Sequence, residues 1–215
     1  MSLRGMQDKI LVATLPHVPF DGWTQRSLAM GAVDAGYRRI DGRRAFPTGI
    51  LELVEHFADY GDRQMVEALA ARDLESMRIR ERITTAVRTR LEIVGPYREA
   101  VKRALSYLAL PQNGIAAARC TYKTVDAIWY AAGDRSADFS FYTKRAQLAG
   151  VYGGTLLYWL SDMSDGNEDS WAFLDRRIEG VMRITRARAR IEEKLAGADC
   201  RLKGLLRRPR FFSRA

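Results

Sequence analysis

Apolar residues recur along the chain mostly at the three- and four-residue spacing of amphipathic helices, while alternating or β-branched runs are few. This pattern predicts an all-α protein, with no strand expected at any position. The predicted helices, whose ends are placed to within about two to four residues, are Gln7–Leu15, Thr24–Ala35, Thr48–Tyr60, Gln64–Met77, Ile79–Ile93, Tyr97–Leu108, Asn113–Ala132, Ser136–Ser161 and Ser170–Leu195.

Several of these helix ends have a physical cause in the sequence. Pro96 and Pro111 cannot continue a helix, and Gly133 can adopt the left-handed conformation that follows a helix end. Ser136 can then cap the next helix, where Asp138 is favourably placed beside the positive end of the helix dipole.

The predicted helix from Ser136 to Ser161 changes character along its length. At its start, helical spacing places one aromatic ring, two cations and a carboxylate on one face, namely Asp138, Phe141, Lys144 and Arg145. We expect that face to be solvated. An exposed phenylalanine there indicates either a partner-binding surface or an isolated surface aromatic, which is common.

Beyond Ala146 the same helix is apolar on every side, which predicts that it is buried. Gly153 and Gly154 interrupt this apolar run, and each costs about 1 kcal/mol relative to alanine inside a helix. Their presence indicates either close approach of another helix or space for a ligand, and ordinary core packing remains the alternative.

Composition and charge narrow the function. The 215 residues, 47% of them apolar, suit one buried core with a short appendage. The net charge of +9 favours an anionic partner, either nucleic acid or an acidic membrane surface. The longest uncharged run, Ala146–Ser161, is shorter than the roughly 20 residues that span a bilayer, so no transmembrane helix is predicted.

The N-terminus and the cysteines bear on location. No secretory or transit leader is expected, because Asp8 comes early and helical patterning begins near Ile10. Cys120 and Cys200 are interpreted as free thiols in a reducing compartment. A cytoplasmic bacterial protein is expected, and a mitochondrial one remains the alternative.

The first sixty residues have the outline of a helix-turn-helix. Yet the connection Tyr37–Pro47 after the second helix is long, and the helix that begins at Thr48 carries Glu52 and Glu55 but no base-reading side chain. Arginines in the connection suit phosphate contacts, which do not specify a sequence. We therefore predict a degenerate helix-turn-helix that binds no specific nucleic acid.

The C-terminal segment Cys200–Arg214 combines six cations with large apolar side chains. It is either a solvated tail or a membrane-binding segment, because basic residues near an anionic surface contribute about 1 kcal/mol each. The predicted membrane-binding residues are Leu202, Lys203, Leu205, Leu206, Arg207, Arg208, Phe211 and Phe212. The resulting division is 1–60 for the degenerate helix-turn-helix, 61–196 for a helical bundle packed with it as one domain, and 197–215 for the tail.

Signatures of catalysis and metal binding are missing from the sequence. Asp162, Asp165, Glu168 and Asp169 lack the ligand spacing of a calcium loop, and acids before a helix are expected from the helix dipole. Only His17 and His56 are available as imidazole ligands, and no Cys/His pair has zinc spacing. Phosphate-binding loops, dinucleotide fingerprints and nucleophile elbows are also absent. We predict no catalytic residue, no metal and no cofactor.

Three blocks of sequence resemble one known family. The strings AGD, DFSFYTKR, VYGGTLLYWLSD and SWAFLDRRI between Trp129 and Met182 are similar to the accessory lipid-binding family of ubiquinone (coenzyme Q) biosynthesis, the ninth protein in that pathway's naming. LPHVPFDGWT (Leu15–Thr24) and AFPTGILELVEHFADYGDRQM (Ala45–Met65) fit the same family, so the resemblance runs from about Ile10 to Met182. It implies a TetR-repressor-like helical fold with a ligand-binding bundle and a homodimer formed through the last two long helices.

The resemblance also implies functional residues. An elongated apolar cavity for a phospholipid or an isoprenoid or quinone lipid would be lined by Leu148, Tyr152, Leu156, Trp159, Phe173, Leu174 and Ile178. The surface that docks the pathway hydroxylase would comprise Asp138, Phe141, Tyr142, Lys144 and Arg145, although the family often has tryptophan at the position of Phe141.

The sequence therefore predicts a non-catalytic protein that presents polyprenylated intermediates to that hydroxylase at an anionic membrane. It would act peripherally at the bacterial inner membrane, or at the mitochondrial matrix face in a eukaryote. A ligand-responsive TetR-type repressor is the alternative, and an enzyme acting on acyl or isoprenoid lipids is a third.

Overall fold

The structure is a computed structural model that describes residues 2–134 and 140–183. Every regular element in these residues is helical and none is a strand, which confirms the all-α prediction. The chain divides into two units, Met1–Leu174 and Asp175–Ala215. In the second unit, residues 175–183 are helical, and Arg183 donates to Glu179 at 2.7 Å.

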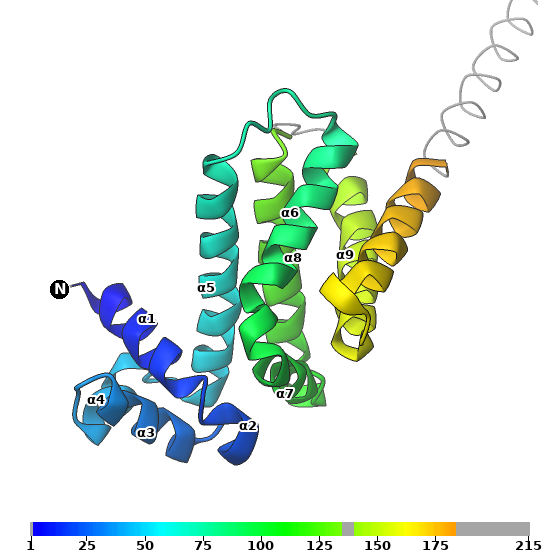
Figure 1. The fold of residues 1–215 in the computed structure, drawn as a ribbon. Helices are drawn as coiled ribbons and strands as arrows, with labels where there is room; N and C mark the ends of the chain where they lie inside the picture. Colours follow the sequence, from blue (N-terminus) through cyan, green and yellow to red (C-terminus); the bar gives the residue numbers. More distant parts are fainter. Residues whose placement is uncertain (1, 135–139, 184–215) are drawn as a thin grey trace, which may run out of the picture. The chain divides into compact units, whose positions relative to one another are not determined.

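Four short helices form the N-terminal part of the first unit: α1 (Leu3–Thr14), α2 (Val18–Asp21), α3 (Gln25–Asp34) and α4 (Arg39–Ala45). They lie at one end of the long helix α5 (Figure 1). Thr24 caps the N-terminus of α3, because its hydroxyl accepts from the amide of Ser27 at 3.2 Å. Gly36 then takes a φ of 82°, which allows the chain to turn directly into α4.

Helix α4 corrects one prediction from the sequence. The connection Tyr37–Pro47 is not a long loop, since α4 follows Gly36 after two residues and occupies the position of a recognition helix. The short helix is hidden in the sequence because its three arginines and Gly42 leave few apolar positions. Gly42 allows α4 to pack closely on α3, since a Cβ there would lie 3.2 Å from the Cβ of Ala32, a tight contact.

Helix α5 (Ile50–Ala70) overturns two further boundaries. It runs unbroken through residues 60–64, and residues 71–78 are not helical, so the predicted helix Gln64–Met77 is wrong. The two predicted regions that meet at residue 60 therefore share this helix. Gly61 does not end it, because the glycine leaves room for a neighbouring side chain: a Cβ there would meet the Arg90 guanidinium at 2.5 Å.

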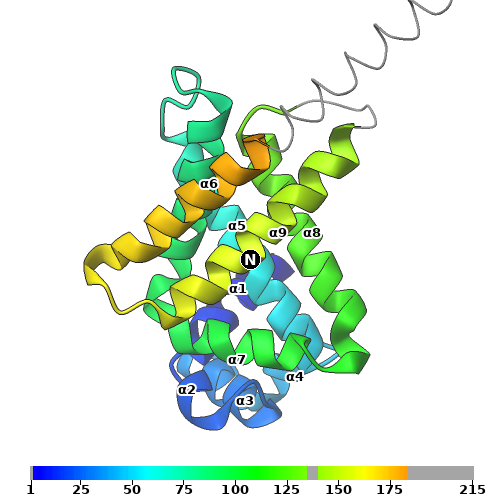
Figure 2. The ribbon, with the colours of Figure 1, turned by 90° about the vertical axis from the view of Figure 1, so that its right-hand side faces the viewer.

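The remaining helices of the first unit build a bundle on α5. Helices α6 (Ile79–Val94) and α8 (Gly114–Ala131) pack against α5, and α9 (Ser140–Ser161) packs against α8. Helix α7 (Arg98–Leu108) lies across one end (Figure 2). The predicted breaks are confirmed: α6 ends before Pro96, Pro111 precedes α8, and Gly133 has a φ of 87°. Ser136 lies outside the described residues.

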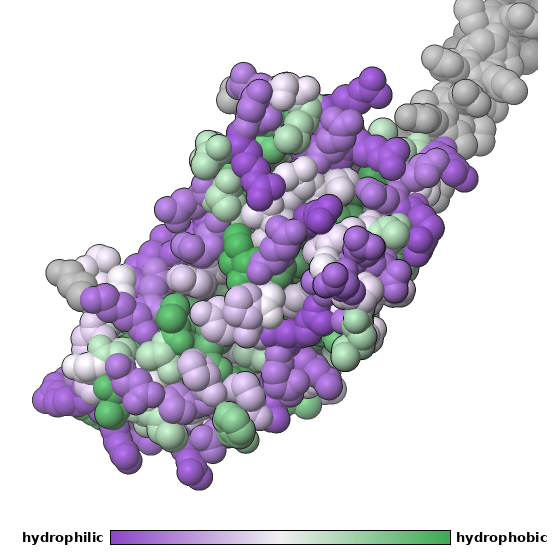
Figure 3. Space-filling view, viewed as in Figure 1, coloured by the Kyte–Doolittle hydropathy of each residue, from purple (hydrophilic) through white to green (hydrophobic). Residues whose placement is uncertain are grey.

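Burial follows the apolar stripes of these helices. The fully buried side chains include Leu53, Met65, Leu69, Leu91 and Ile128. On the face shown in Figure 3, hydrophobic residues form small patches interrupted by hydrophilic ones. No helix among the described residues is long and apolar enough to cross a membrane.

Helix α9 is less buried than its sequence predicts. Leu148, Tyr152, Leu156 and Trp159 are buried, but Leu157 is 64% exposed and Tyr158 38% exposed. A Cβ built on Gly153 meets nothing within 4 Å, so this glycine is not explained by close approach of a described residue. The prediction that this half of α9 is buried on every side is therefore wrong, because the described residues cover Tyr158 only in part and leave Leu157 mostly exposed.

The acidic loop after α9 is a capping structure. The Asp162 carboxylate accepts from the amides of Ser164 and Ser170, each at 2.8 Å, and from both serine hydroxyls. Burial alone would raise the pKa of Asp162, but these hydrogen bonds lower it well below its ordinary value. The carboxylate thus tightens the loop before the helical residues 168–174 that close the first unit.

Candidate functional site

A cavity of about 240 Å³ lies inside the first unit. Helices α5 to α9 all contribute to its wall, most of which is aliphatic or aromatic. Its lining comprises Val54, Phe57, Ala58, Arg90, Val94, Val101, Ala104, Leu105, Leu108, Ala109, Ala117, Cys120, Thr121, Thr124, Tyr152 and Leu156. An apolar cavity with a few convergent polar groups is the usual form of a small-molecule site.

The polar side of the cavity is organised by a buried ion pair. Arg90 on α6 donates through Nε to Asp62 Oδ1 on α5 at 2.7 Å, and through Nη2 to the carbonyl of Ala58 at 3.1 Å. Thr124 on α8 donates to Asp62 Oδ1 at 2.9 Å. Three helices are therefore joined by hydrogen bonds to one carboxylate.

Burial and pairing act in opposite directions on this ion pair. Burial raises the pKa of Asp62, while the Arg90 guanidinium and the Thr124 hydroxyl oppose that shift. Burial alone would lower the pKa of Arg90, but the Tyr152 hydroxyl and the Asp62 carboxylate raise it above its ordinary value. Arg90 therefore stays cationic, and the pair carries no net charge when Asp62 is ionised.

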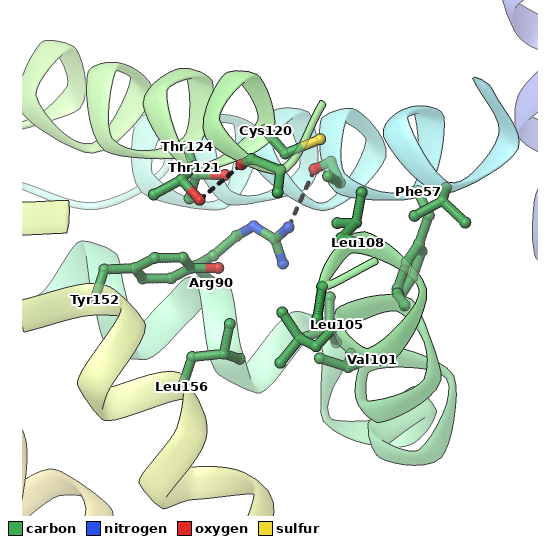
Figure 4. Close-up of a pocket in the computed structure, with 16 residues that line it drawn as sticks. Phe57, Arg90, Val101, Leu105, Leu108, Cys120, Thr121, Thr124, Tyr152 and Leu156 are labelled. Carbon is green, nitrogen blue, oxygen red and sulfur yellow. Dashed lines mark hydrogen bonds between the residues drawn. The ribbon is translucent and has the colours of Figure 1, made fainter. Parts of the chain in front are cut away.

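Tyr152 and Cys120 complete the polar lining. Tyr152 is 7% exposed, and its hydroxyl makes no hydrogen bond to any residue that the structure describes. Figure 4 shows its ring beside the Arg90 guanidinium, with both side chains directed into the same space. Burial raises the pKa of the Cys120 thiol to about 11, which makes it a poor nucleophile at neutral pH.

The structure brings only part of the predicted lipid-binding set to this cavity. Tyr152 and Leu156 line it, whereas Leu148, Trp159 and Leu174 are buried elsewhere in the first unit. Phe173 stacks on Tyr158 with ring centroids 4.7 Å apart. Ile178 belongs to the second unit.

The predicted partner face is arranged differently from its expected solvated form. Arg145 is 7% exposed and is held by Asp126 of α8 at 2.7 Å, with its guanidinium over the Phe141 ring at 3.3 Å. The expectation of a solvated charged face is wrong there, because these contacts cover Arg145. Tyr142 is the exposed aromatic, at 71%, and it packs edge-on against half-buried Phe141.

Of the other residues predicted for the partner surface and the tail, the structure describes only Lys144. Lys144 forms an ion pair with Asp134 at 3.1 Å. Asp138 lies outside the described residues, as do the predicted membrane-binding residues Leu202, Lys203, Leu205, Leu206, Arg207, Arg208, Phe211 and Phe212.

Sequence reasoning missed the ion pair and the walls supplied by α5 to α8. A signal was present for both charged residues, because each interrupts an apolar helical stripe. Arg90 falls between Val87 and Leu91 on the buried face of α6, and Asp62 precedes Met65 on that of α5. A charged residue on a buried stripe is rarely unpaired. Two such residues of opposite charge on neighbouring helices therefore predict a buried ion pair.

Comparisons with known proteins identify the family. The sequence model of the COQ9 family matches residues 115–185. "Ubiquinone biosynthesis protein COQ9, mitochondrial" from Rattus norvegicus is 35% identical over 214 residues, which cover 93% of this chain and 68% of the relative. The chain belongs to the COQ9 family.

Two further COQ9 relatives support this membership. The protein of the same name from Homo sapiens is 33% identical and matches 93% of this chain and 67% of its own length. The Drosophila melanogaster protein is 38% identical over 180 residues, and the match spans 82% of this chain but only 55% of the relative.

A solved structure shows the fold more directly. The TetR transcriptional regulator from Nitrosomonas europaea ATCC 19718 superimposes with a TM-score of 0.66, covering 81% of this chain and 97% of its own. Its sequence identity of 18% supports a shared fold alone. This member of the COQ9 family therefore has a TetR-like fold, as its sequence resemblance implied.

Proposed function

We propose that this COQ9-family protein is a non-catalytic lipid-binding accessory protein of ubiquinone biosynthesis. It takes up polyprenylated intermediates at an anionic membrane surface and presents them to the pathway hydroxylase. Family membership supports the role in ubiquinone biosynthesis. Lipid binding, the lack of catalysis, membrane attachment, presentation to the hydroxylase and homodimer formation are proposals that go beyond family membership.

The observation that carries lipid binding is the cavity of about 240 Å³ with its largely apolar wall. For comparison, an engineered apolar cavity of about 150 Å³ stays dry and binds benzene. A wall of this kind favours apolar matter, and the described residues include no group of three potential metal ligands. The aromatic pair Phe141–Tyr142, with Tyr142 exposed, supports hydroxylase docking, because exposed aromatics are frequent binding anchors.

Filling the cavity tests this function. Leu156→Trp places a larger ring in the cavity wall, while Leu157→Trp changes the next residue, which is 64% exposed and does not line the cavity. We expect solvent extraction and mass spectrometry to find co-purified lipid in the native protein and in Leu157→Trp, and much less in Leu156→Trp. Equal lipid in the two variants, or none in the native protein, would contradict lipid binding in this cavity.

Location follows the same proposal. The relatives are named as mitochondrial proteins, which supports a mitochondrial location; the matrix face of a membrane is the site of action that we propose there. The basic segment Cys200–Arg214 supports attachment to an anionic surface through its six cations.

The alternative of a transcriptional repressor rests on the helix-turn-helix. Arg39 and Arg43 are exposed on α4, the element that reads DNA in this fold. Arg38, however, donates to Asp41 at 3.0 Å and 3.1 Å, so one carboxylate faces the same surface. This arrangement favours weak phosphate contacts over recognition of a base sequence.

A further inference from the structure

The cavity has one polar end whose donors are incompletely used. Arg90 uses Nε for Asp62 and Nη2 for the Ala58 carbonyl, and no hydrogen bond from Nη1 to a described residue is present. The Tyr152 hydroxyl likewise makes no hydrogen bond to a described residue. Tyr152 is only 7% exposed. Figure 4 shows these two side chains converging from α6 and α9.

The position of Arg90 is imposed by its neighbours. Gly61 provides space for the guanidinium, since a Cβ there would come within 2.5 Å of it. Asp62 and Ala58 hold two of its nitrogens from the same helix. The guanidinium is thereby fixed with its third nitrogen available to the cavity, as a preorganised donor should be.

Buried donors without acceptors are costly, so a ligand that supplies an oxygen gains a large preference over one that does not. The local charge determines whether the preferred ligand oxygen is anionic or neutral. Arg90 is already neutralised by Asp62 at 2.7 Å, and a carboxylate ligand would leave a net negative charge in a low-dielectric interior. A ketone or quinone oxygen accepts the same hydrogen bonds without that penalty.

We infer that Arg90 and Tyr152 form a head-group subsite, which selects lipids whose head carries a neutral oxygen acceptor and places that head at the polar end of the cavity. The apolar tail then contacts the wall formed by Val101, Leu105 and Leu108 of α7. This inference rests on the proposed lipid-binding function and adds to it the chemistry of the head and the residues that select it.

Three compounds of similar size separate the contributions: cumene has no acceptor, acetophenone has a neutral carbonyl, and benzoate has an anionic head. A cavity of about 240 Å³ suits their size, given that about 150 Å³ holds benzene. Dissociation constants are measured by NMR titration of the full chain after removal of co-purified lipid on a hydrophobic resin. We expect acetophenone to bind at least about tenfold more tightly than cumene, and more tightly than benzoate.

Tyr152→Phe removes only the hydroxyl and should reduce the preference for acetophenone severalfold while leaving cumene binding unchanged. Tyr158→Phe is the matched control, because Tyr158 is on the same helix but does not line the cavity. Since removal of Arg90 alone would leave Asp62 buried and unpaired, the second variant is Arg90→Met combined with Asp62→Leu. It should abolish the remaining preference for acetophenone.

The outcomes distinguish this inference from the function on which it rests. Cumene and acetophenone binding equally, or benzoate binding most tightly, would overturn the head-group subsite and leave apolar binding intact. If none of the three binds and no lipid co-purifies with the native protein, the proposed function and the subsite both fail.

Discussion

At the scale of single residues, some polar side chains inside the bundle have hydrogen-bond partners among the described residues and others do not. The hydroxyl of Thr124 donates to Asp62 at 2.9 Å. The hydroxyl of Thr89 on α6 is buried and has no hydrogen-bond partner among the described residues, although the side chain is only 3% exposed. An unsatisfied buried hydroxyl costs free energy, because it has lost its hydrogen bonds to water.

Thr89→Val should therefore stabilise the protein by about 1 kcal/mol, since valine keeps the shape and removes the orphaned hydroxyl. Thr124→Val is the matched control and should destabilise by about 1–2 kcal/mol, because it removes a hydrogen bond to a charged group. Urea unfolding gives both free energies. A less stable Thr89→Val protein would show that this hydroxyl has a favourable interaction.

The Cys120 thiol offers a second residue-scale prediction. Because burial raises its pKa from 9.0 to about 11, only about one molecule in a thousand is thiolate at pH 8. In a Cys200→Ser background, the rate of alkylation by iodoacetamide should rise about tenfold per pH unit up to pH 10. An ordinary thiol would level off near pH 9, and such a plateau would refute the raised pKa.

At the scale of elements, helix ends were predictable wherever one residue imposes them. Pro96, Pro111 and Gly133 act through their own backbone chemistry, and each break occurs as predicted. The errors occur where a distant neighbour decides. Gly61 lies in the predicted gap between the helices Thr48–Tyr60 and Gln64–Met77, yet it allows close packing with Arg90, which is 29 residues later in the chain and on another helix.

Helix α4 illustrates the same limit. Its sequence, RIDGRRA, has too few apolar residues to show a helical period, and it folds where α3 and the turn at Gly36 place it. Its buried residues Gly42 and Ala45 are small, so the signal of burial is weak. The packing of α4 on its neighbours therefore determines that it is a helix, and this packing cannot be predicted from its seven residues alone.

The crossing of α1 and α3 depends on another close approach. A Cβ at Gly31 would lie 2.6 Å from Thr14 Cα and 2.7 Å from its backbone nitrogen. Gly31→Ala should therefore destabilise the protein by about 1–3 kcal/mol, since backbone must shift. Gly114→Ala is the control, because Gly114 is in a helical conformation and its added Cβ meets nothing within 4 Å.

The control should be neutral or stabilise by about 0.5–1 kcal/mol, through the lower entropy of the unfolded chain. Thermal unfolding monitored by circular dichroism measures both variants. Equal stability of the two variants would mean that α1 and α3 can separate at no cost, contrary to the contact seen at Thr14.

Helix α4 should bind DNA only weakly and without sequence preference. Arg39 and Arg43 are exposed and suit phosphates, while Asp41 opposes the approach of an anion and pairs with Arg38. Affinity for random duplex DNA should fall steeply with salt, and Arg43→Ala should lower the logarithmic salt slope by about 1. Arg80→Ala, an exposed arginine on α6, serves as the control. A short sequence preferred about a thousandfold at physiological salt would establish a repressor instead.

At the scale of the whole molecule, the family and the fold were accessible from sequence, while the cavity was only partly so. Tyr152 and Leu156 were selected through the family resemblance, because the apolar, glycine-interrupted pattern of α9 leaves both core packing and ligand binding open. Val101 and Leu105 on α7 have the spacing of any amphipathic helix, and only the crossing of α7 over the bundle directs them to the cavity. Helical periodicity therefore predicts which face of a helix is buried, but it does not predict whether that face packs in the core or lines a cavity.

The protein should have two separable attachments, one to the membrane and one to the hydroxylase. Truncation after Ala198 removes six cations together with Leu202, Leu205, Leu206, Phe211 and Phe212. Association with liposomes that contain anionic phospholipid should then fall steeply, because each basic residue contributes about 1 kcal/mol at such a surface. Sedimentation measures the bound fraction, while circular dichroism and lipid extraction check that the fold and bound lipid persist.

Changing Phe141 and Tyr142 to alanine should weaken binding to the hydroxylase and leave binding to liposomes unchanged. The exposed Tyr142 ring and its edge contact with Phe141 would be lost, so hydroxylase binding should weaken while liposome binding remains at the native level. Tyr130→Ala is a suitable control, since Tyr130 is equally exposed, at 72%, but lies on α8. Pull-down of the purified hydroxylase measures docking, and ubiquinone synthesis in cells that lack the native protein measures its consequence. Undiminished liposome binding after truncation would exclude the tail as the membrane attachment, and normal ubiquinone synthesis by the double variant would exclude the aromatic pair as the docking surface.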